Sequence, residues 1–569
     1  MADELDRKGL AAVQANDSNE LTGLEKYRVV LSLSNTVADN TVKFTVAENC
    51  ITIEAKTANA IGYGVDTFTQ DCLFEGALNL KSSYNNKTVT VPASTLGKLS
   101  LPAYTGNGTL AEELYSAGYA ATEGLDSEQS VMHLIEGTTK NAFESYVSTL
   151  VSTYGYTKDF SNTIDNNSFA LLTDPVGQTY YMYYMQKTGE STGTARFILD
   201  RSSNVTLGEF NTAKADESGN EAAEFYMFNM NTSNEDTFLI RTKANTWIVI
   251  DGGVTDRGTV DTEGQFADSI YSFMREKSGL ANGEKVVISA WYMTHAHRDH
   301  FLAFAKLIEK YHDMIDLRRI MANVPDHNAF SSKWNSNKTD YLACMEKVRE
   351  YYPNVEYLKA FTGMQITVAG IELEVLLSQD MMVDYLVENK TEHEIHWSLQ
   401  TYNGTCGYCD GNACRLGYKS YDFNNTSLVT KITIDGMTVL ETGDAYRLDV
   451  WLNPYYTIDT LNVDILKVAH HFNNWELVAQ NNNSGKKDES KFYWQLLEAK
   501  ANEEFYALVT HEEHTLSGAK LAWKNAFANS DDHHFIEGSY DYIYCFKKVN
   551  GEIKMTSEEA DYSARYKEQ

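Results

Sequence analysis

The length, composition and charge of this chain exclude several classes of protein. With 569 residues, and roughly 100–200 residues in an ordinary domain, we expect about three domains. A hydrophobic fraction of 43% and a charged fraction of 22% are typical of folded proteins, whereas a net charge of −31 argues against long nucleic acid as a partner.

Composition also bears on where the protein works. The first residues, MADELDRKGL, lack the apolar core of a signal peptide, and no apolar run is long enough to predict a transmembrane segment. The 36 Tyr, the 6 Pro and runs such as SNTIDNNS resemble secreted and surface proteins of bacteria. We therefore expect a secreted or cell-surface bacterial protein whose export signal has been removed.

Residues 1–104 are expected to form a β-rich accessory domain. From Tyr27 to about Ala103, apolar residues alternate in KFTVAENCITIEAKT and KTVTVPAS, which is the period of half-buried strands. The segment Ile51 to Phe68, ITIEAKTANAIGYGVDTF, resembles the small N-terminal domain of hexosaminidase-type glycosidases over fewer than twenty residues.

A linker and a small module are expected next. Residues 105–130 are rich in Gly, Thr and Ser and show no sustained period, which predicts a linker. In residues 131–205, Phe143, Val147 and Leu150 recur at helical spacing, and SFALLTD, TYYMYYMQ and TARFILD predict three strands. This region is expected to be a small α+β module.

Residues 221–549 alternate strands and helices, and residues 550–569 are expected to be a tail. TFLIRTKANTWIVIDGG predicts two strands joined by a tight turn. KITIDGMTVLETGD predicts a second such hairpin, with its turn at Asp435-Gly436. A sandwich of sheets with helices outside needs this alternation. The fold class predicted is α/β.

A dense group of metal-binding residues follows the strand VVISAWYM. THAHRDH presents His295, His297, Asp299 and His300 from one strand-to-helix loop, since Phe301, Phe304, Ala305 and Ile308 mark the buried face of a helix. Imidazoles and a carboxylate from such a loop suit Zn²⁺ or a similar ion, with His295 and His297 facing one metal and Asp299 and His300 the other.

These residues resemble the first metal motif of the metallo-β-lactamase superfamily. The IVIDGG turn, LETGDA and DILKVAHHF agree with later motifs of that family in order, and NNTSLV echoes its ComEC-type DNA-uptake hydrolases and secreted choline-phosphate esterases. The resemblance implies an αββα four-layer sandwich, one or two divalent ions (Zn²⁺, with Mn²⁺ as the alternative), and a phosphodiester or similar ester as substrate.

The resemblance also implies further site residues. Asp444 is expected to bridge the metals. We assign His470 to the metal because it continues the alternation of Leu466 and Val468, which leaves His471 either facing the substrate or in a structural role. Asp299 would bind metal or orient the nucleophile, and His471 or His514 would protonate the leaving group.

The chain departs from the family at two places near the metals. Many members have a third histidine for the first metal where this chain has Asn424 and Asn425, and Phe472 stands where a glycine is usual. We expect the substrate pocket to be lined by Asn424, Asn425, Ser427 and Phe472. His393 or His396 would be substitute ligands, or else surface residues of a polar loop.

Two other groups are open to more than one interpretation. His514 lies close to the start of the helix GAKLAWKNAF, where it would contact substrate or cap the helix. Cys406, Cys409 and Cys414 in CGYCDGNAC have the start of a zinc-ligand spacing without a clear fourth ligand, so a local disulfide or free thiols are the alternatives.

The leading hypothesis is an extracellular metal-dependent phosphodiesterase that acts on a small molecule or a cell-envelope component. The alternatives are a hydrolase of lactones, β-lactams or other esters, and a binding protein that uses the fold as a scaffold. A nuclease would fit the family, but the acidic balance argues against long polyanions.

Overall fold

The computed structural model describes residues 28–559 with gaps. Outside the description lie residues 1–27, 35, 39–40, 48–49, 57–60, 62–63, 66–67, 69–72, 75–76, 79–83, 91–94, 97–100, 118–129, 176, 201–202, 213–221, 229–234, 254–263, 325–334, 384–422, 446–447, 474–476, 480–487, 511–515, 539–541 and 560–569. No helix in the described part of the chain is long and apolar enough to cross a membrane.

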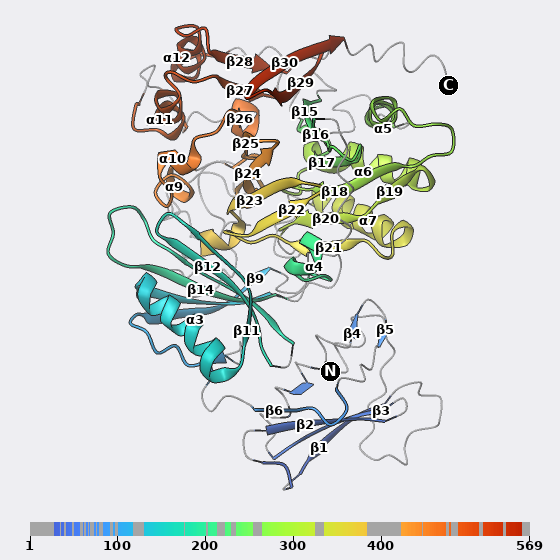
Figure 1. The fold of residues 1–569 in the computed structure, drawn as a ribbon, viewed down its shortest axis with the longest axis vertical. Helices are drawn as coiled ribbons and strands as arrows, with labels where there is room; N and C mark the ends of the chain where they lie inside the picture. The colour runs from blue at the N-terminus through green and yellow to red at the C-terminus, as the bar shows by residue number, and fades with distance from the viewer. Residues whose placement is uncertain are drawn as a thin grey trace.

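The N-terminal part contains a four-stranded sheet, blue in Figure 1. Its strand order is β1-β3-β2-β6, over β1 (Arg28–Leu33), β2 (Thr41–Ala47), β3 (Cys50–Ala55) and β6 (Thr88–Thr90). Two short strand pairs accompany it, namely β4 (Leu73–Phe74) with β5 (Ala77–Leu78) and β7 (Thr95–Leu96) with β8 (Leu101–Pro102). Phe44 and Ile53 alternate with half-buried residues, which confirms the predicted strands.

A six-stranded antiparallel sheet follows, in the order β11-β12-β13-β14-β10-β9. Its strands are β9 (Thr109–Ala117), β10 (Ser130–Thr138), β11 (Thr157–Ile164), β12 (Asn167–Thr173), β13 (Thr179–Met185) and β14 (Gly193–Asp200). The last three are the predicted strands. β9, however, lies inside the stretch predicted to be a linker. That prediction is wrong there because two irregularities in the pairing of β9 with β10 interrupt the period of two.

Both faces of the six-stranded sheet are covered. Helix α3 (Lys140–Tyr154) packs on one face through the predicted residues Phe143, Val147 and Leu150. The other face joins the core of the C-terminal region, where the Tyr181 hydroxyl donates a 2.6 Å hydrogen bond to the carbonyl of Thr362. The sheet is therefore built into the C-terminal region on one side.

The first C-terminal sheet has nine strands. The order β21-β20-β18-β17-β16-β15-β29-β30, with β19 beside β18, joins β15 (Glu224–Met227), β16 (Thr237–Arg241), β17 (Trp247–Asp251), β18 (Val286–Tyr292), β19 (Ile315–Leu317), β20 (Arg319–Ala322), β21 (Glu356–Lys359), β29 (Tyr542–Val549) and β30 (Glu552–Glu559). β30 lies where a tail was predicted, and that prediction is wrong for its residues. Most of this edge strand is exposed, so it lacks apolar alternation.

The second C-terminal sheet has seven strands in the order β22-β23-β24-β25-β26-β27-β28. They are β22 (Gln365–Val368), β23 (Ile371–Leu377), β24 (Val429–Ile434), β25 (Met437–Glu441), β26 (Ile465–Lys467), β27 (Phe505–Val509) and β28 (His533–Glu537). The predicted β24–β25 hairpin turns at Asp435 and Gly436, whose φ angles of 51° and 81° are those a two-residue hairpin turn needs.

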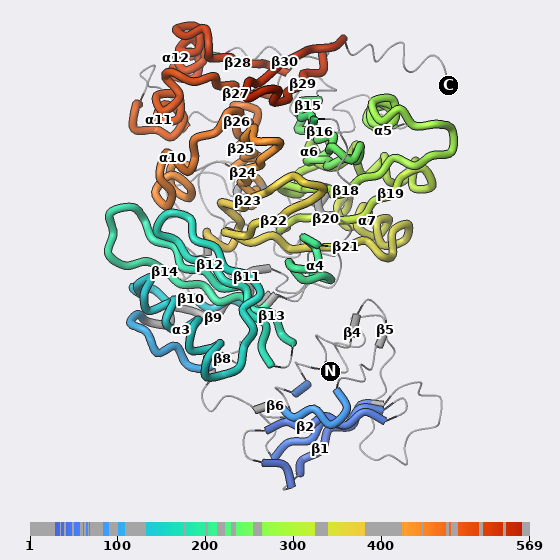
Figure 2. Tube along the Cα trace, in the orientation of Figure 1, coloured from blue at the N-terminus to red at the C-terminus, as the bar shows by residue number. Residues whose placement is uncertain are grey.

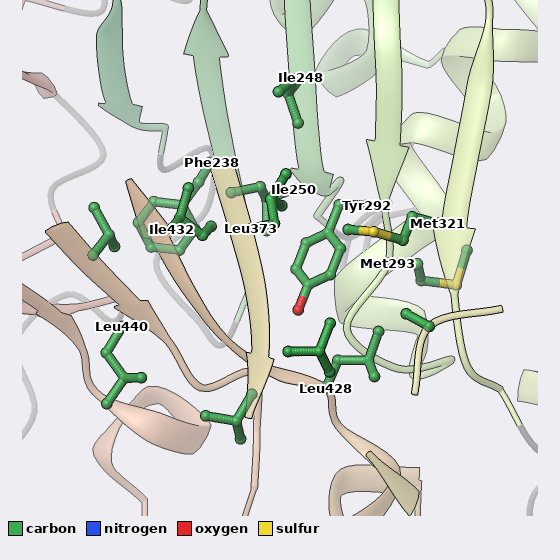
Figure 3. Packing of buried hydrophobic residues seen from close by; sticks show 14 of the residues in the cluster. Phe238, Ile248, Ile250, Tyr292, Met293, Met321, Leu373, Leu428, Ile432 and Leu440 are labelled. Atoms are coloured by element: carbon green, nitrogen blue, oxygen red, sulfur yellow. The ribbon is translucent and has the colours of Figure 1, made fainter. Parts of the chain in front are cut away.

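The two C-terminal sheets pack face to face. Phe238, Ile250 and Tyr292 of the first sheet meet Leu373, Ile432 and Leu440 of the second in one buried cluster (Figure 3). Outside the sheets lie α5 (Gln265–Ser278), α6 (Arg298–Tyr311) and α7 (Asn335–Tyr351) on one side, and α11 (Phe492–Ala499) and α12 (Gly518–Phe527) on the other (Figure 2). This is the αββα order of layers predicted from the sequence.

Short helices complete the description. They are α4 (Leu207–Thr212), η4 (His312–Met314), η7 (Gln379–Val383), η9 (Phe423–Thr426), α9 (Leu448–Trp451), α10 (Ile458–Leu461) and η10 (Ala469–Phe472). Two of these, η9 and η10, carry site residues. η9 precedes β24 and η10 follows β26, both at the end of the second sheet that faces the loop after β18.

Candidate metal centre

The His-x-His-x-Asp-His loop is held between β17 and α6. The Thr294 backbone N and its hydroxyl donate to Oδ1 and Oδ2 of Asp251, the last residue of β17, at 2.7 and 2.8 Å. At Gly252 a Cβ atom would lie 2.4 Å from the Cβ of Phe304 in α6. Glycine is therefore required where the chain leaves β17, and its absence of a side chain brings the loop and the helix together.

The first set of side chains, called the His295 group here, consists of His295, His297 and Asn424. All three are buried. The Nε2 of His295 lies 3.2 Å from Nδ1 of His297 and 3.1 Å from Oδ1 of Asn424. The group combines the loop after β18 with η9, two segments more than 120 residues apart in sequence.

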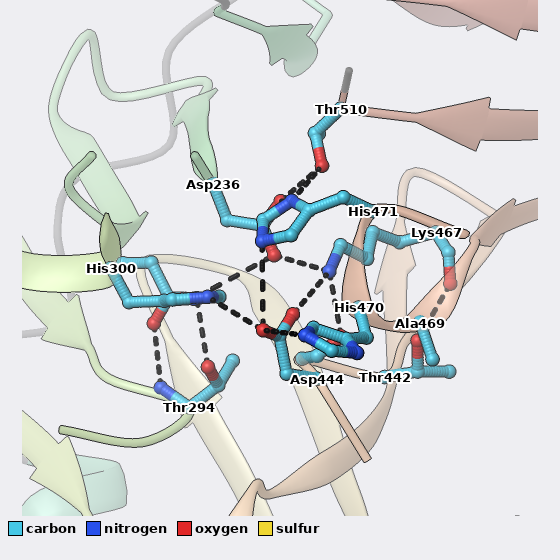
Figure 4. Close-up of polar contacts among 12 residues, drawn as sticks. Asp236, Thr294, His300, Thr442, Asp444, Lys467, Ala469, His470, His471 and Thr510 are labelled. Atoms are coloured by element: carbon cyan, nitrogen blue, oxygen red, sulfur yellow. Dashed lines mark hydrogen bonds and ion pairs between the residues drawn. The ribbon is translucent and has the colours of Figure 1, made fainter. Parts of the chain in front are cut away.

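The second set, called the His300 group, consists of His300, His471 and Asp236. The Nε2 atoms of His300 and His471 lie 3.3 and 3.5 Å from Oδ2 of Asp444 (Figure 4). Their Nδ1 atoms face Asp236 at 3.6 and 3.4 Å. The two imidazoles thus turn one nitrogen toward Asp444 and the other toward a buried carboxylate, which fixes their orientation.

Asp444 joins the two groups. Its Oδ2 is also 4.0 Å from Nε2 of His295, and its backbone N donates to the Ser427 hydroxyl at 3.0 Å. The turn before it needs Gly443, because a Cβ there would lie 2.9 Å from that of Ser427 and 3.0 Å from that of Thr294. Asp444, which the resemblance gives as the residue that bridges the metals, thus lies between the two groups.

Further partners hold the His300 group from behind. Nδ1 of His300 lies 2.7 Å from Oδ2 of Asp251, and Nδ1 of His471 lies 2.9 Å from the hydroxyl of Thr510. Thr510 also donates a short hydrogen bond to Asp236. Lys467, wholly buried, forms a close ion pair with Asp236 and lies 3.5 Å from Oδ1 of Asp444.

The two groups differ in electrostatics. Burial lowers the pKa of His295 well below its usual value and that of His297 to about 4. Burial also disfavours the charged form of His471, but Asp444 and Asp236 outweigh it and raise its pKa to about 9. The same balance, with Asp251 added, raises the pKa of His300 well above its usual value.

The buried carboxylates and Lys467 shift one another's pKa. Burial would raise the pKa of Asp444, but His471, His300 and His470 hold it well below its usual value. Burial disfavours a charged Lys467, yet Asp236, Asp444 and Glu441 raise its pKa. Burial raises the pKa of Glu441 to about 8, although Lys467 opposes that shift. The centre is therefore a buried network of opposite charges.

His470 and His471 do not lie where the alternation of strand residues predicted. β26 ends at Lys467, and His470 and His471 have φ angles of 51° and 50°, so the alternation of Leu466 and Val468 does not extend to them. His471 is wholly buried in the His300 group, whereas the His470 side chain is 19% exposed, with Nε2 3.8 Å from Asp444 Oδ2. The expected placement of the pair is thus reversed.

Of the other predicted site residues, one lies at the edge of the centre, one lies in the hydrophobic core, and several lie outside the described residues. Asp299 Oδ2 lies 3.8 Å from Nε2 of His471, at the edge of the centre. Phe472, which we expected to line the substrate pocket, is fully buried and packs on the rings of Tyr493 and Trp523. The side chain of Asn425 and all of His514, His393 and His396, together with Cys406, Cys409 and Cys414, lie outside the described residues.

Sequence reasoning missed three buried residues of the centre. Asp251 stands in the IVIDGG turn that was used only for the fold. Asp236 precedes the strand TFLIR, and Lys467 interrupts the apolar run ILKVA. A charged residue in a strand buried on both faces is rarely found without a partner, and this signal could have identified Lys467.

The residues present fit divalent metal ions. Two sets of ligand atoms lie within 4.8 Å of one another, one from Asp236, His300, Asp444 and His471 and the other from His295, His297 and Asp444. Nε2 of His300 and Oδ1 of Asp444 are buried and make no hydrogen bond within the described part of the chain. Imidazole nitrogen and carboxylate oxygen are ligands suited to Zn²⁺ and related ions.

Comparisons with known proteins give similarities at low identity. No family model matches the chain, and no curated protein matches it. Similar solved structures include the metallo-β-lactamase-fold protein YhfI of Bacillus subtilis (11% identity, 57% of this chain and 100% of that one, TM-score 0.29). A diphosphatase of the PhnP family (10%, 56% and 96%, 0.27) and yeast PDE1 (9%, 56% and 98%, 0.31) are also similar. At such low TM-scores and identities these similarities carry no argument about the function of this chain.

Proposed function

We propose that this protein is a metal-dependent hydrolase of the metallo-β-lactamase fold, and that it cleaves phosphodiesters. The observation that carries the proposal is the meeting of two buried His/Asp groups at Asp444. A buried network of this kind is costly to maintain without a bound cation, because buried polar atoms without partners are unfavourable.

Each group would hold one ion, with Asp444 shared between them. Such ions supply a nucleophile near neutral pH, because they lower the pKa of water from about 16 to about 7. Asp299, at the edge of the centre, would bind metal or orient the nucleophile. His470 is partly exposed beside Asp444 and is the described histidine best placed to meet a substrate.

The bond cleaved is proposed from the sequence motifs. NNTSLV, TGD and LKVAHH occur in the order found in phosphodiesterase relatives of the fold. The net charge of −31 disfavours a long polyanion, so we propose a small phosphodiester or a cell-envelope component as the substrate. On composition we further propose that the protein acts outside a bacterial cell. His514 remains a proposed proton donor.

The test is a substrate panel on the full chain. We expect bis(p-nitrophenyl) phosphate to be hydrolysed with Zn²⁺ or Mn²⁺, the activity to disappear with a chelator, and the ions to restore it. His300→Ala should lose the activity, whereas the control His312→Ala, which changes a half-buried histidine of η4, should keep it.

Other outcomes would change or refute the proposal. Hydrolysis of nitrocefin or a lactone, without the phosphodiester, would keep the centre and change the bond. A protein that binds no metal and hydrolyses none of these substrates would instead be a binding protein on this scaffold.

A further inference from the structure

Asn424 is held in a fixed position, although it lies outside the strands of the sheet. It lies in η9, directly before β24, with its side chain buried. Its carbonyl accepts from the backbone N of Ser427 at 3.1 Å, and the backbone N of Leu428 donates to the Thr294 carbonyl at 3.0 Å. These bonds tie η9 to the loop that carries His295, so the amide of Asn424 has a fixed position.

Three donor atoms meet at this position. Nε2 of His295 is 3.2 Å from Nδ1 of His297 and 3.1 Å from Oδ1 of Asn424, and Oδ2 of Asp444 follows at 4.0 Å. Ligands that lie about 2.0–2.2 Å from a common ion are roughly 3.0–3.6 Å apart. The two shorter separations fall in that range.

The tautomer of His295 supports a cation between these atoms. The single proton of the Thr294 hydroxyl is donated to Asp251 at 2.8 Å, so Thr294 Oγ1 can only accept from Nδ1 of His295 at 3.1 Å. In the neutral imidazole the proton is then on Nδ1 and Nε2 carries a lone pair. The lone pair on Nε2 faces the amide oxygen of Asn424 at 3.1 Å, and a cation between the two atoms would remove the repulsion between them.

We propose that the side-chain oxygen of Asn424 is a metal ligand, together with His295 Nε2, His297 Nδ1 and the shared Asp444. The inference rests on the metal centre of the proposed function. It gives Asn424 the place that a third histidine takes in many relatives, instead of the substrate-lining role expected from the sequence.

This ligand set predicts a particular ion preference. An amide oxygen is neutral and harder than an imidazole nitrogen, and carbonyl ligands suit Mn²⁺ and Mg²⁺ better than they suit Zn²⁺. The His295 group also contributes no carboxylate besides the shared Asp444. We therefore expect this position to bind more weakly than the His300 position and to accept Mn²⁺ more readily.

The experiment measures metal content and affinity, not activity. The full chain is freed of metal, titrated with Mn²⁺ and separately with Zn²⁺ by calorimetry, and analysed for bound metal after dialysis. Wild type should bind two ions. Asn424→Ala should keep the tighter ion and lose at least about 100-fold in affinity for the weaker one, the upper end of what loss of an outer partner causes.

Two substitutions separate a ligand from a hydrogen-bond donor. Asn424→Asp keeps an oxygen at the position but cannot donate, so two ions with equal or tighter binding are expected if Asn424 is a ligand. If the amide instead donates its N–H to His295, Asn424→Asp should lose the weaker ion as Asn424→Ala does. Asn424→His should raise the affinity for Zn²⁺ relative to Mn²⁺.

The control is Asn167→Ala, which removes another fully buried amide, one that donates to the carbonyl of Tyr455 away from the centre. It should leave both affinities unchanged. Two ions bound by Asn424→Ala with wild-type affinities would overturn the inference while leaving the proposed function intact. A wild-type chain that binds no metal would overturn both.

Discussion

The two groups of the centre share Asp444 but are supported in opposite ways. Carboxylates stand behind the two imidazoles of the His300 group, Asp251 behind His300 and Asp236 behind both, and together with Asp444 they raise the pKa of His300 and His471. Behind the His295 group stands the hydroxyl of Thr294, and burial lowers the pKa of His295 and His297. A carboxylate behind an imidazole orients it and strengthens it as a ligand, whereas a hydroxyl only orients it.

One sequence motif thus contributes to two groups that we expect to differ in their affinity for metal. His295, His297 and His300 come from a single loop, yet their surroundings are set by residues far away in sequence. We expect the His300 position to fill first and the His295 position to respond to the choice of ion. The substitutions below test this inequality.

Asp444→Asn should have the largest effect, because Asp444 is common to both groups. We expect both ions to be lost and hydrolysis to fall by several orders of magnitude. With a chelator present, the free energy of unfolding measured with urea should be about 3–5 kcal/mol lower than that of the wild type. The reason is that Lys467 and two imidazoles lose a buried, negatively charged partner. Asp313→Asn, at an exposed aspartate, is the control. Retention of one tightly bound ion would show that the groups are independent.

Lys467→Met should destabilise the metal-free protein by a similar amount, about 3–5 kcal/mol, because it leaves Asp236 and Asp444 without their buried cation. Bound ions supply positive charge to the same carboxylates, so the loss should shrink when Mn²⁺ is present. Urea unfolding with and without Mn²⁺ measures the difference, with the exposed Lys347→Met as control. Equal losses under both conditions would contradict the argument.

Asp236→Asn should weaken metal binding at the His300 group more than at the His295 group. Asp236 faces Nδ1 of His300 and His471 but does not contact His295 in any described interaction. The affinity of the tighter ion should fall by about 10–100-fold, while the weaker ion is little affected. Calorimetric titration checks both values. Asp174→Asn is the matched control, because Asp174 is a buried aspartate in the turn between β12 and β13 that accepts from the backbone N of Gln178. A larger loss at the weaker ion would reverse our ranking of the two groups.

Thr510→Val should have the smallest effect. The Thr510 hydroxyl carries no charge itself, and the net contribution of a typical hydrogen bond is about 1 kcal/mol, or roughly fivefold in affinity. The change should appear only in the tighter ion. A loss as large as that of Asp236→Asn would mean that the hydroxyl, rather than the carboxylate, orders His471.

The layers of the fold could be predicted where apolar periodicity is strong. β12 to β14, α3, β16 to β18, α6 and the β24–β25 hairpin all follow patterns visible in the sequence. β9 and β30 could not be predicted, because pairing irregularities hide the period in one and exposure on both faces removes it in the other.

The candidate site could be predicted only for residues that belong to a local motif. His295, His297, His300 and Asp444 belong to such motifs and lie close together. We assigned His470 to the metal by strand alternation, but the chain leaves the strand geometry after Lys467 and places His471 in the buried group. Asp236 and Lys467 meet the centre through pairings of strands that no local pattern encodes.

The six-stranded sheet has a consequence for how the protein can be divided. The N-terminal sheet has a small core of its own, but Phe169, Tyr181 and Tyr183 share theirs with the C-terminal region. A fragment that begins near residue 221 would lack these three side chains and would expose to water the buried residues on which they pack, such as Phe361, which invites aggregation. The smallest unit of this protein that we expect to fold is therefore the six-stranded sheet together with the two C-terminal sheets, whereas the separate core of the N-terminal sheet leaves that sheet outside this unit.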